Sequence, residues 1–409
     1  MSNIITSDLS LSLVLEEPYL TNPYPLYQQL RSTTPVYWDD PLKSWVLMRY
    51  QDILAALSNR RIASPPPPDI LSFIPLEMQE QGQHLIELQS RQFLYLDPPD
   101  HTRLRGLVNK AFTPHRVAKM RSSIQQVVDG LLDTLEQKGR GEILEDVAVP
   151  LATNAIALLI GVPSEDWEQF ALWTEDLFTF GRGSYLHMSS QQWAQAVKGI
   201  IEFMDYLRKL AAQRLSEPQD DLLQILVTAL AEDALSEDEF LATCMLLIGA
   251  GNVTTTNLIT NGLYILLQHP EQMEEVKHDP ALFPAAINEI LRYDGPAQQR
   301  MREAKEDLTL GDQQVMKGQQ IILCLGSANR DPEQFPEPDQ FNIHRTDNRH
   351  LAFAHGPHFC VGSPLALLEA EVALSTLLHR FPHIHLDEKE PIEWKPIISR
   401  SLKKLPVVL

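Results

Sequence analysis

Cysteine is scarce in this chain: Cys244, Cys324 and Cys360 are the only three in 409 residues, and each is isolated in the sequence. Isolated cysteines suggest neither a disulfide framework nor a paired-cysteine zinc site. Any cysteine with a chemical role must therefore act alone.

Basic residues are also few. Lys and Arg number 34 against 54 Asp and Glu, a formal net charge of −20. Such a surface repels nucleic acid and anionic lipid, so we expect no nucleic-acid partner. The segment 1–19 has no basic stretch, and its apolar run is broken well before the ~18 residues that a membrane span needs. We expect a cytoplasmic monomer without a membrane anchor.

Gly/Ser linkers and fixed-period repeats are absent, so nothing in the sequence indicates a domain boundary. Apolar residues recur at helical spacing over most of the chain, most clearly in 117–137, 166–180, 191–215 and 364–381. Strand-like segments are few and short: 36–48, 319–325 and 405–409. The sequence predicts one large, mainly α-helical domain with a small β portion, spanning residues 1–409.

A proline run, Ser64-Pro-Pro-Pro-Pro-Asp69, cannot continue a helix, and apolar residues follow it over 70–74. A stiff loop that carries apolar side chains can cap a pocket. It can equally be a surface connector with a few residues tucked into the core.

The segment Phe353-Ala-His-Gly-Pro-His-Phe-Cys-Val-Gly362 places one cysteine in a loop directly before a predicted helix. Pro364 stands where the first turn of a helix tolerates proline. The N–H groups at the start of that helix favour a negative sulfur and are expected to lower the pKa of Cys360. Such a thiolate suits a bound metal ion.

This segment resembles the haem-binding loop of the cytochrome P450 family, in which Phe, Gly, His or Arg, Cys and Gly recur at fixed spacing. The matching residues are Phe353, Gly356, His358, Cys360, Gly362 and Ala366. One residue departs from the pattern, because Ala354 stands where the family usually has Gly. The resemblance continues almost unbroken from the long helix described below to the C-terminus, and more weakly back to Asn22. It implies haem b (iron protoporphyrin IX) as cofactor, with Cys360 as the iron ligand and with Phe353 and Gly362 beside the haem.

Haem carries two carboxylates that need cationic partners in a largely dry site. His101 and Arg105 are spaced i, i+4 on a predicted helix, so both lie on one face. By resemblance these two residues, together with Arg302 and His358, match the positions that bind the haem propionates. Each alone could be an ordinary surface charge.

A second implied cluster is structural. Glu289 and Arg292 form an i, i+3 acid–base pair, which is a weak signal on its own. Arg345 follows where the family's third partner would stand. The resemblance implies a buried Glu289–Arg292–Arg345 network behind the haem.

Ser236-Glu-Asp-Glu239 is typical of a capping box, and apolar periodicity then runs to about residue 268. In the middle of this long predicted helix lies Gly249-Ala-Gly-Asn-Val-Thr-Thr-Thr256, where glycine and threonine weaken a helix. Close packing at small residues would explain it. By resemblance this is the helix over the haem, where Gly251 leaves room for dioxygen and Thr254 and Thr255 serve a proton relay. The acid of that relay is replaced by Val253.

The resemblance implies a monooxygenase of secondary metabolism that inserts one oxygen atom from dioxygen into an apolar small molecule. We expect an acidic ferredoxin- or flavodoxin-type electron donor to dock at the cluster of six basic residues between His101 and Arg121. Two alternatives remain open: a haem-thiolate enzyme for oxidative coupling, dehydration or peroxide-driven chemistry, and a non-catalytic haem protein that binds or senses a ligand.

The expected substrate contacts are Ile70, Phe73, Phe178, Phe180, Met245, Ile248, Ala297, Gln298 and Ser399, with Gln299 and Ile398 beside them.

Overall fold

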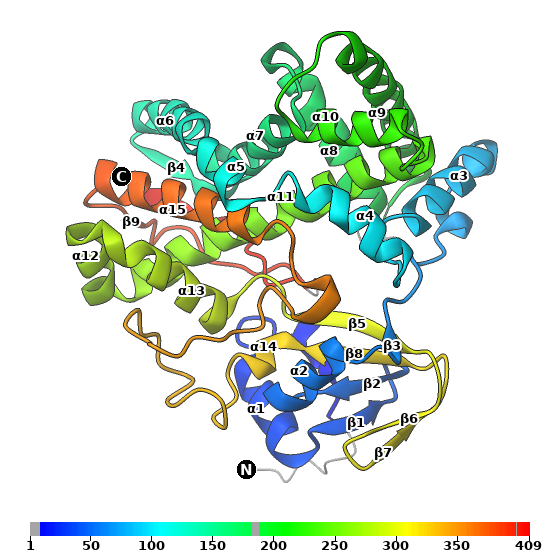
Figure 1. The fold of residues 1–409 in the computed structure, drawn as a ribbon. Helices are drawn as coiled ribbons and strands as arrows, with labels where there is room; N and C mark the ends of the chain where they lie inside the picture. Colours follow the sequence, from blue (N-terminus) through cyan, green and yellow to red (C-terminus); the bar gives the residue numbers. More distant parts are fainter. Residues whose placement is uncertain (1–8, 182–187, 398) are drawn as a thin grey trace.

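Helices make up most of the computed structural model (Figure 1), which describes residues 9–181, 188–397 and 399–409. The α-helices, in chain order, are α1 (Tyr24–Thr33), α2 (Tyr50–Ser58), α3 (Gln79–Ser90), α4 (Asp100–Asn109), α5 (Pro114–Lys119), α6 (Arg121–Lys138), α7 (Val149–Ile160), α8 (Trp167–Gly181), α9 (Ser190–Ser216), α10 (Leu222–Ala231), α11 (Glu237–Gln268), α12 (Pro270–His278), α13 (Phe283–Asp294), α14 (Leu325–Ala328) and α15 (Ser363–Arg380).

Three small sheets complete the fold. A five-stranded sheet has the order β1-β2-β8-β5-β3, a three-stranded sheet has the order β4-β10-β9, and β6 pairs with β7. The strands are β1 (Val36–Asp39), β2 (Ser44–Leu47), β3 (Ile62–Ala63), β4 (Arg140–Glu142), β5 (Gln299–Ala304), β6 (Leu308–Leu310), β7 (Gln313–Val315), β8 (Gln320–Cys324), β9 (His385–Leu386) and β10 (Pro406–Val408). In the view of Figure 1 the five-stranded sheet and the β6–β7 pair lie at the bottom, whereas β4 and β9 lie among the helices beside α6 and α15. The mainly α prediction with a small β portion is confirmed, and each predicted strand segment contains an observed strand.

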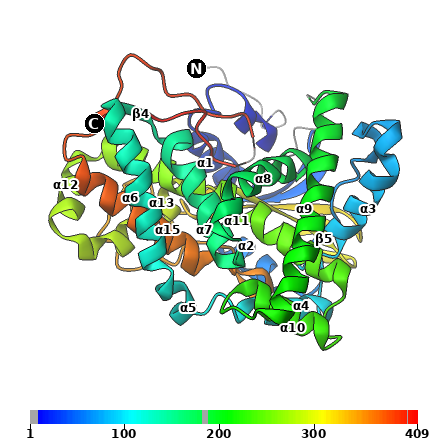
Figure 2. The ribbon, with the colours of Figure 1, turned by 90° about the horizontal axis from the view of Figure 1, so that it is seen from above.

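The long helix α11 is the core of the helical part. Its N-terminus has the predicted capping box, in which Ser236 and Glu239 satisfy each other's backbone N–H groups. It packs against α7, α8, α13 and α15 (Figure 2). Among the described residues it alone is long and apolar enough to cross a membrane, yet 72% of its most apolar window is buried inside the protein. It is therefore the core helix of this fold.

One predicted helix is divided in two. The segment 117–137 was expected to be continuous, but α5 ends and α6 begins around Met120, whose N–H bonds to the carbonyl of Val117, three residues back. The physical reason lies upstream: Thr113 caps α5 through its side chain, and Pro114 fits its first turn. Residues 64–70 form an irregular loop, as the proline run predicts.

Candidate active site

The cysteine lies on a short loop held against the start of α15. The N–H of Cys360 donates to the carbonyl of Phe353 at 3.0 Å, which closes the loop. Gly356 has a φ of +73°, and a Cβ there would lie 2.6 Å from the carbonyl oxygen of Leu57, so only glycine fits. Ala354 also adopts a left-handed conformation, with φ +58°, at the position where the related loops carry glycine. The backbone of the loop is thus kept despite the methyl group.

Burial raises the pKa of the Cys360 thiol, because a thiolate loses hydration in the interior. The N–H groups of Gly362 and Ser363 and the guanidinium groups of Arg300 and Arg105 lower the pKa, but they do not outweigh burial. The expected lowering is therefore wrong for the polypeptide alone. A cation bound to the sulfur would supply the missing stabilisation.

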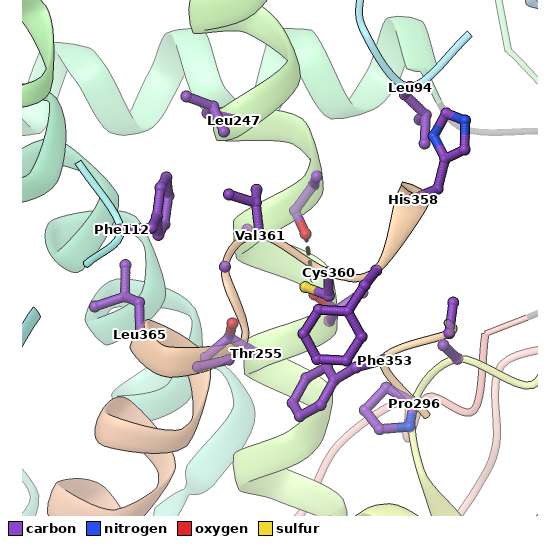
Figure 3. A pocket seen from close by; sticks show the side chains of 18 of the residues that line it. Leu94, Phe112, Leu247, Thr255, Pro296, Phe353, His358, Cys360, Val361 and Leu365 are labelled. Atoms are coloured by element: carbon purple, nitrogen blue, oxygen red, sulfur yellow. Dashed lines mark hydrogen bonds between the residues drawn. The ribbon is translucent and has the colours of Figure 1, made fainter. Parts of the chain in front are cut away.

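A cavity separates this loop from α11. Its walls include Gly251, Thr254 and Thr255 on the helix, and Phe353 and Cys360 on the loop. Figure 3 shows Thr255 on α11 and Cys360 on the loop that faces it. The empty space amounts to about 1160 Å³, part of it open to solvent. The structure thus brings the three expected residues of α11 to the same cavity as the cysteine.

Cationic and imidazole side chains gather at one side of the cavity. The rings of His101 and His358 lie 4.2 Å apart, and Arg105 donates to the carbonyl of Phe359. His101 is buried with neither ring nitrogen hydrogen-bonded. Burial, His101, Arg302 and Arg105 lower the pKa of His358 to about 3. All four residues expected at the propionates are therefore close together.

No carboxylate of the described chain is bound directly by this cluster, because Asp97, the acid that acts on His101 and Arg302, pairs with Lys305. No Asp or Glu within the described ranges forms an ion pair with Arg105 or Arg302. The buried imidazole of His101 has no hydrogen bonds, and the guanidinium groups beside it form no ion pairs with acids. Such a site is suited to binding negatively charged groups. Cationic partners for two propionates and the sulfur of the loop cysteine border the same cavity, so the residues present fit a thiolate-bound haem. Among the described residues no three His, Cys, Asp or Glu side chains converge on a bare metal site.

The network on α13 has the predicted geometry. The guanidinium of Arg292 donates to both carboxylate oxygens of Glu289, at 2.7 and 2.8 Å, and Arg345 approaches the same carboxylate at 3.2 Å. The side chains of Glu289 and Arg292 are fully buried. Arg292 also donates to the carbonyls of Asn329, Pro338 and Gln340, so it ties α13 to the loop ahead of the cysteine.

The polar residues of α11 are not placed as a relay. The hydroxyl of Thr254 donates to the carbonyl of Ala250 at 2.9 Å. Asn252 is buried and donates to Thr153 at 2.6 Å, away from the cavity. Val253 is not a wall residue of the cavity. Neither position before Thr254 therefore offers a titratable group to the site.

Only one of the expected substrate contacts, Ala297, lines this cavity. Met245 and Ile248 are buried on other sides of α11, whereas Leu246 and Leu247 face the cavity. Because α11 is apolar all round, its sequence does not show which of these residues face the cavity. The other residues predicted to contact the substrate do not line this cavity, and their contact with a substrate stays a prediction: Ile70, Phe73, Phe178, Phe180, Met245, Ile248, Gln298 and Ser399.

The physical reasons differ from residue to residue. Phe73 stacks on Trp193 with ring centroids 6.4 Å apart, and Phe180 meets the same Trp193 edge-on at 6.0 Å. Ile70 belongs to the core. Gln298 donates to the carbonyl of Gly295. Ser399 pairs with Ala297 through a β-bridge, and Ile398 lies outside the described residues.

Two cavity residues were missed. Glu369 on α15 is buried, one of its oxygens has no partner, and burial raises its pKa well above the usual value. In the sequence Glu369 stands four residues after Leu365, which places both side chains on one face of the helix. This spacing could have indicated that Glu369 borders the cavity. Arg300 on β5 also borders the cavity. It is two residues before Arg302, and alternate strand residues share a face.

The basic cluster expected to attract the electron donor is largely paired. Arg116 and Lys119 both contact Asp220, at 2.7 and 3.7 Å. Arg103 pairs with Glu239, and Arg121 with Glu371. Arg105 borders the cavity. The positive field of this cluster is therefore much weaker than the sequence alone suggests.

The comparisons with known proteins agree with this geometry. The family model described as Cytochrome P450 matches residues 77–407. The biotin biosynthesis cytochrome P450 of Bacillus subtilis is 38% identical over 401 residues, which cover 95% of this chain and 96% of that protein. The 6-deoxyerythronolide B hydroxylase of Saccharopolyspora erythraea is 34% identical over 400 residues, covering 94% and 96%.

Solved structures lead to the same family. P450BioI, crystallised with an acyl carrier protein that carries hexadec-9Z-enoic acid, superposes with a TM-score of 0.85 at 37% identity, covering 96% of this chain and 99% of that one. CalO2 superposes with a TM-score of 0.87 at 28% identity, covering 97% and 98%. The chain therefore belongs to the cytochrome P450 family.

Proposed function

We propose that this protein is a haem b monooxygenase that inserts one oxygen atom into a largely apolar small molecule of secondary metabolism, with Cys360 as the iron ligand. The observation that carries the proposal is the cavity that joins Cys360 to Gly251 and Thr254 on α11. Relatives named for biotin and polyketide biosynthesis and for a hydroxylase support it. We further propose that it acts in the cytoplasm as a monomer.

Each residue then has a role in holding the cofactor. Cys360 supplies the thiolate, and the propionates lie at His101, Arg105, Arg302 and His358. Phe353 and Gly362 border the cavity beside the sulfur. A thiolate-bound haem supplies dioxygen binding and O–O cleavage. The protein orients the substrate and excludes water.

The test of this function is spectroscopic and then chemical. A compound library is screened for molecules that shift the Soret band of the purified holoenzyme. Hits are incubated with NADPH and a surrogate ferredoxin system, and we expect an oxygenated product. Binding without NADPH-dependent turnover would instead favour the non-catalytic ligand-binding alternative.

A positioned acid contributes about 10²–10⁴-fold to a proton-transfer step, and Val253 cannot do this. We therefore expect protons to come from water or from the substrate. The position of Asn252, turned toward Thr153, supports an atypical relay. It keeps oxidative coupling, dehydration or peroxide-driven chemistry as the second candidate function.

Val253→Asp is expected to leave the product formed per NADPH unchanged or to lower it. The reason is that Val253 lies outside the cavity wall, and a part-buried carboxylate without a partner is costly there. Product and NADPH are measured together with the true substrate. Val253→Asn is the matched control, since it adds polarity at similar size without a titratable group. A large gain in coupling with Asp and not with Asn would contradict this expectation.

We propose a ferredoxin- or flavodoxin-type electron donor that docks at the basic cluster around α5. Since Asp220 neutralises Arg116 and Lys119, Asp220→Asn is expected to raise the reduction rate by an acidic [2Fe–2S] ferredoxin about 2- to 5-fold at low ionic strength. The gain should vanish at high salt, where surface charges are screened. Stopped-flow reduction at two salt concentrations measures it.

The matched control is Asp40→Asn. This residue is exposed and pairs with Lys43 at 2.8 Å beside β1, in the sheet region, and the change alters net charge equally. If both variants raise the rate alike, net charge and not the cluster governs docking. If neither changes the rate, the donor docks elsewhere.

A further inference from the structure

Arg300 is a further cation at the cavity, beside the four residues assigned to the propionates. It is the second residue of β5, where it pairs in register with Leu323 of β8. Arg300 and Arg302 share one face of the strand, and Met301 between them is 43% exposed on the other. Pro296 and Ala297, just before the strand, line the cavity with Arg300. The strand thus leads from the cavity toward the propionate cluster.

The described surroundings of Arg300 offer its charge no carboxylate, and the acidic group that acts on it is the thiol of Cys360, which the haem iron would take. The guanidinium lies deep in the protein, and burial lowers its pKa. Its side chain is only partly accessible, and it borders the cavity. It donates to the carbonyl of its neighbour Gln299 at 3.2 Å. No Asp or Glu in the ranges described forms an ion pair with it. A guanidinium in such a place is stable only with an anion in reach.

The propionate cluster is complete without it. His358 is surrounded by His101, Arg302 and Arg105, the charged or titratable neighbours that act on it. Arg300 is not among the neighbours of His358, and it acts within the cluster only on Arg302, where two like charges repel. Haem b has two propionates, and these four side chains already provide their partners. Arg300 is therefore left for a different anion in the same cavity.

We propose that Arg300 binds a carboxylate of the substrate, so that the enzyme acts on amphipathic carboxylic acids. This inference rests on the proposed monooxygenase function and names its substrate class. The planar fork of a guanidinium matches a carboxylate with two parallel hydrogen bonds. Apolar walls at Phe93, Leu94, Leu246 and Leu247 receive the hydrocarbon body. One unpaired cation fits one carboxylate, whereas a phosphate dianion needs more positive charge.

The test uses probes whose imidazole nitrogen binds the haem iron, so that one end of each probe has a fixed position. Ferric holoenzyme is titrated with 1-alkylimidazoles and with the ω-(imidazol-1-yl)alkanoic acids of equal chain length, over a series of lengths. The Soret shift on ligation of the imidazole nitrogen gives each Kd. At one or more lengths the wild type is expected to bind the acid about 10-fold or more tightly than the neutral probe, since charged hydrogen bonds contribute about 1.5–3 kcal/mol.

Arg300→Leu is expected to abolish the preference for the acid and to change the affinity for the neutral probe less than about 3-fold. Arg300→Lys keeps the charge without the fork and should keep part of the preference. Met301→Leu, on the opposite face, is the matched control and should behave as the wild type. Haem content per protein is measured for every variant, and Arg300→Lys serves where the Leu variant does not fold.

Every other outcome overturns the proposal. Equal affinity of the wild type for acid and neutral probes at all lengths shows that Arg300 takes no substrate carboxylate. Loss of haem from Arg300→Leu, with both probes weakened alike, shows that it holds a propionate. A reduced carbonyl complex of the wild type without the red-shifted Soret band shows that the proposed function itself is wrong.

Discussion

Cys360→Ser is expected to abolish the red-shifted Soret band of the reduced carbonyl complex and to remove monooxygenase activity. A neutral hydroxyl is a poor iron ligand beside a thiolate and lacks its electron donation. The exchange keeps the size of the side chain, and the loop is held by backbone bonds such as that from the Cys360 N–H to Phe353. The measurement is the difference spectrum of dithionite-reduced protein with and without carbon monoxide.

The chain offers two matched controls. Cys244 and Cys324 are fully buried free cysteines, one on α11 and one at the end of β8. Their replacement by alanine, which adds no polar group to the core, should keep the red-shifted band. Persistence of the band in Cys360→Ser, or its loss in either control, would show that Cys360 is not the ligand. Haem content by the pyridine haemochromogen assay separates loss of the thiolate from loss of the cofactor.

Local signals in the sequence were sufficient for most helices and for the cysteine loop. The cap at Ser236 and the proline at position 364 depend on residues close together in the chain, and both helices begin as predicted. The residues of the cationic cluster come from α4, β5 and the cysteine loop. Spacing alone could not bring these segments together, so their joint placement depended on the family resemblance.

The faces of buried elements could not be predicted in the same way. In an amphipathic helix the apolar stripe identifies the buried face. Helix α11 is buried on several sides, so the sequence does not distinguish Leu246, which lines the cavity, from Met245, which does not. Ala297 and Gln298 are neighbours in an extended segment, so their side chains alternate between opposite sides. The sequence does not show which of the two sides faces the cavity. Arg300 could have been found by that alternation, counted back from Arg302. The raised pKa of Glu369 could not be predicted, because it follows from burial, which the sequence does not display.

Arg292→Ala is expected to lower the free energy of unfolding by about 3–5 kcal/mol, because it leaves the fully buried carboxylate of Glu289 without its bidentate partner. Arg345 and the N–H of Asn342 still reach that carboxylate, at 3.2 and 2.9 Å, and keep the loss within this range. The carbonyls of Asn329, Pro338 and Gln340 lose their donor as well. Urea unfolding followed by circular dichroism measures the effect, with an unchanged m-value as the check on two-state behaviour.

Arg208→Ala is the matched control, since Arg208 also pairs with an acid three residues before it on a helix. Its contacts to Asp205 and to Glu237 are 2.8 and 2.7 Å long, but the side chain is 39% exposed, so each pair contributes at most about 1 kcal/mol. Arg292→Lys keeps the charge without the fork and should fall between wild type and Arg292→Ala, which provides a measurable variant if the alanine form does not accumulate. If Arg292→Ala loses no more stability than Arg208→Ala, the network does not hold the loop ahead of the cysteine. The burial of Glu289 and Arg292 would then follow only from the position of α13 in the core.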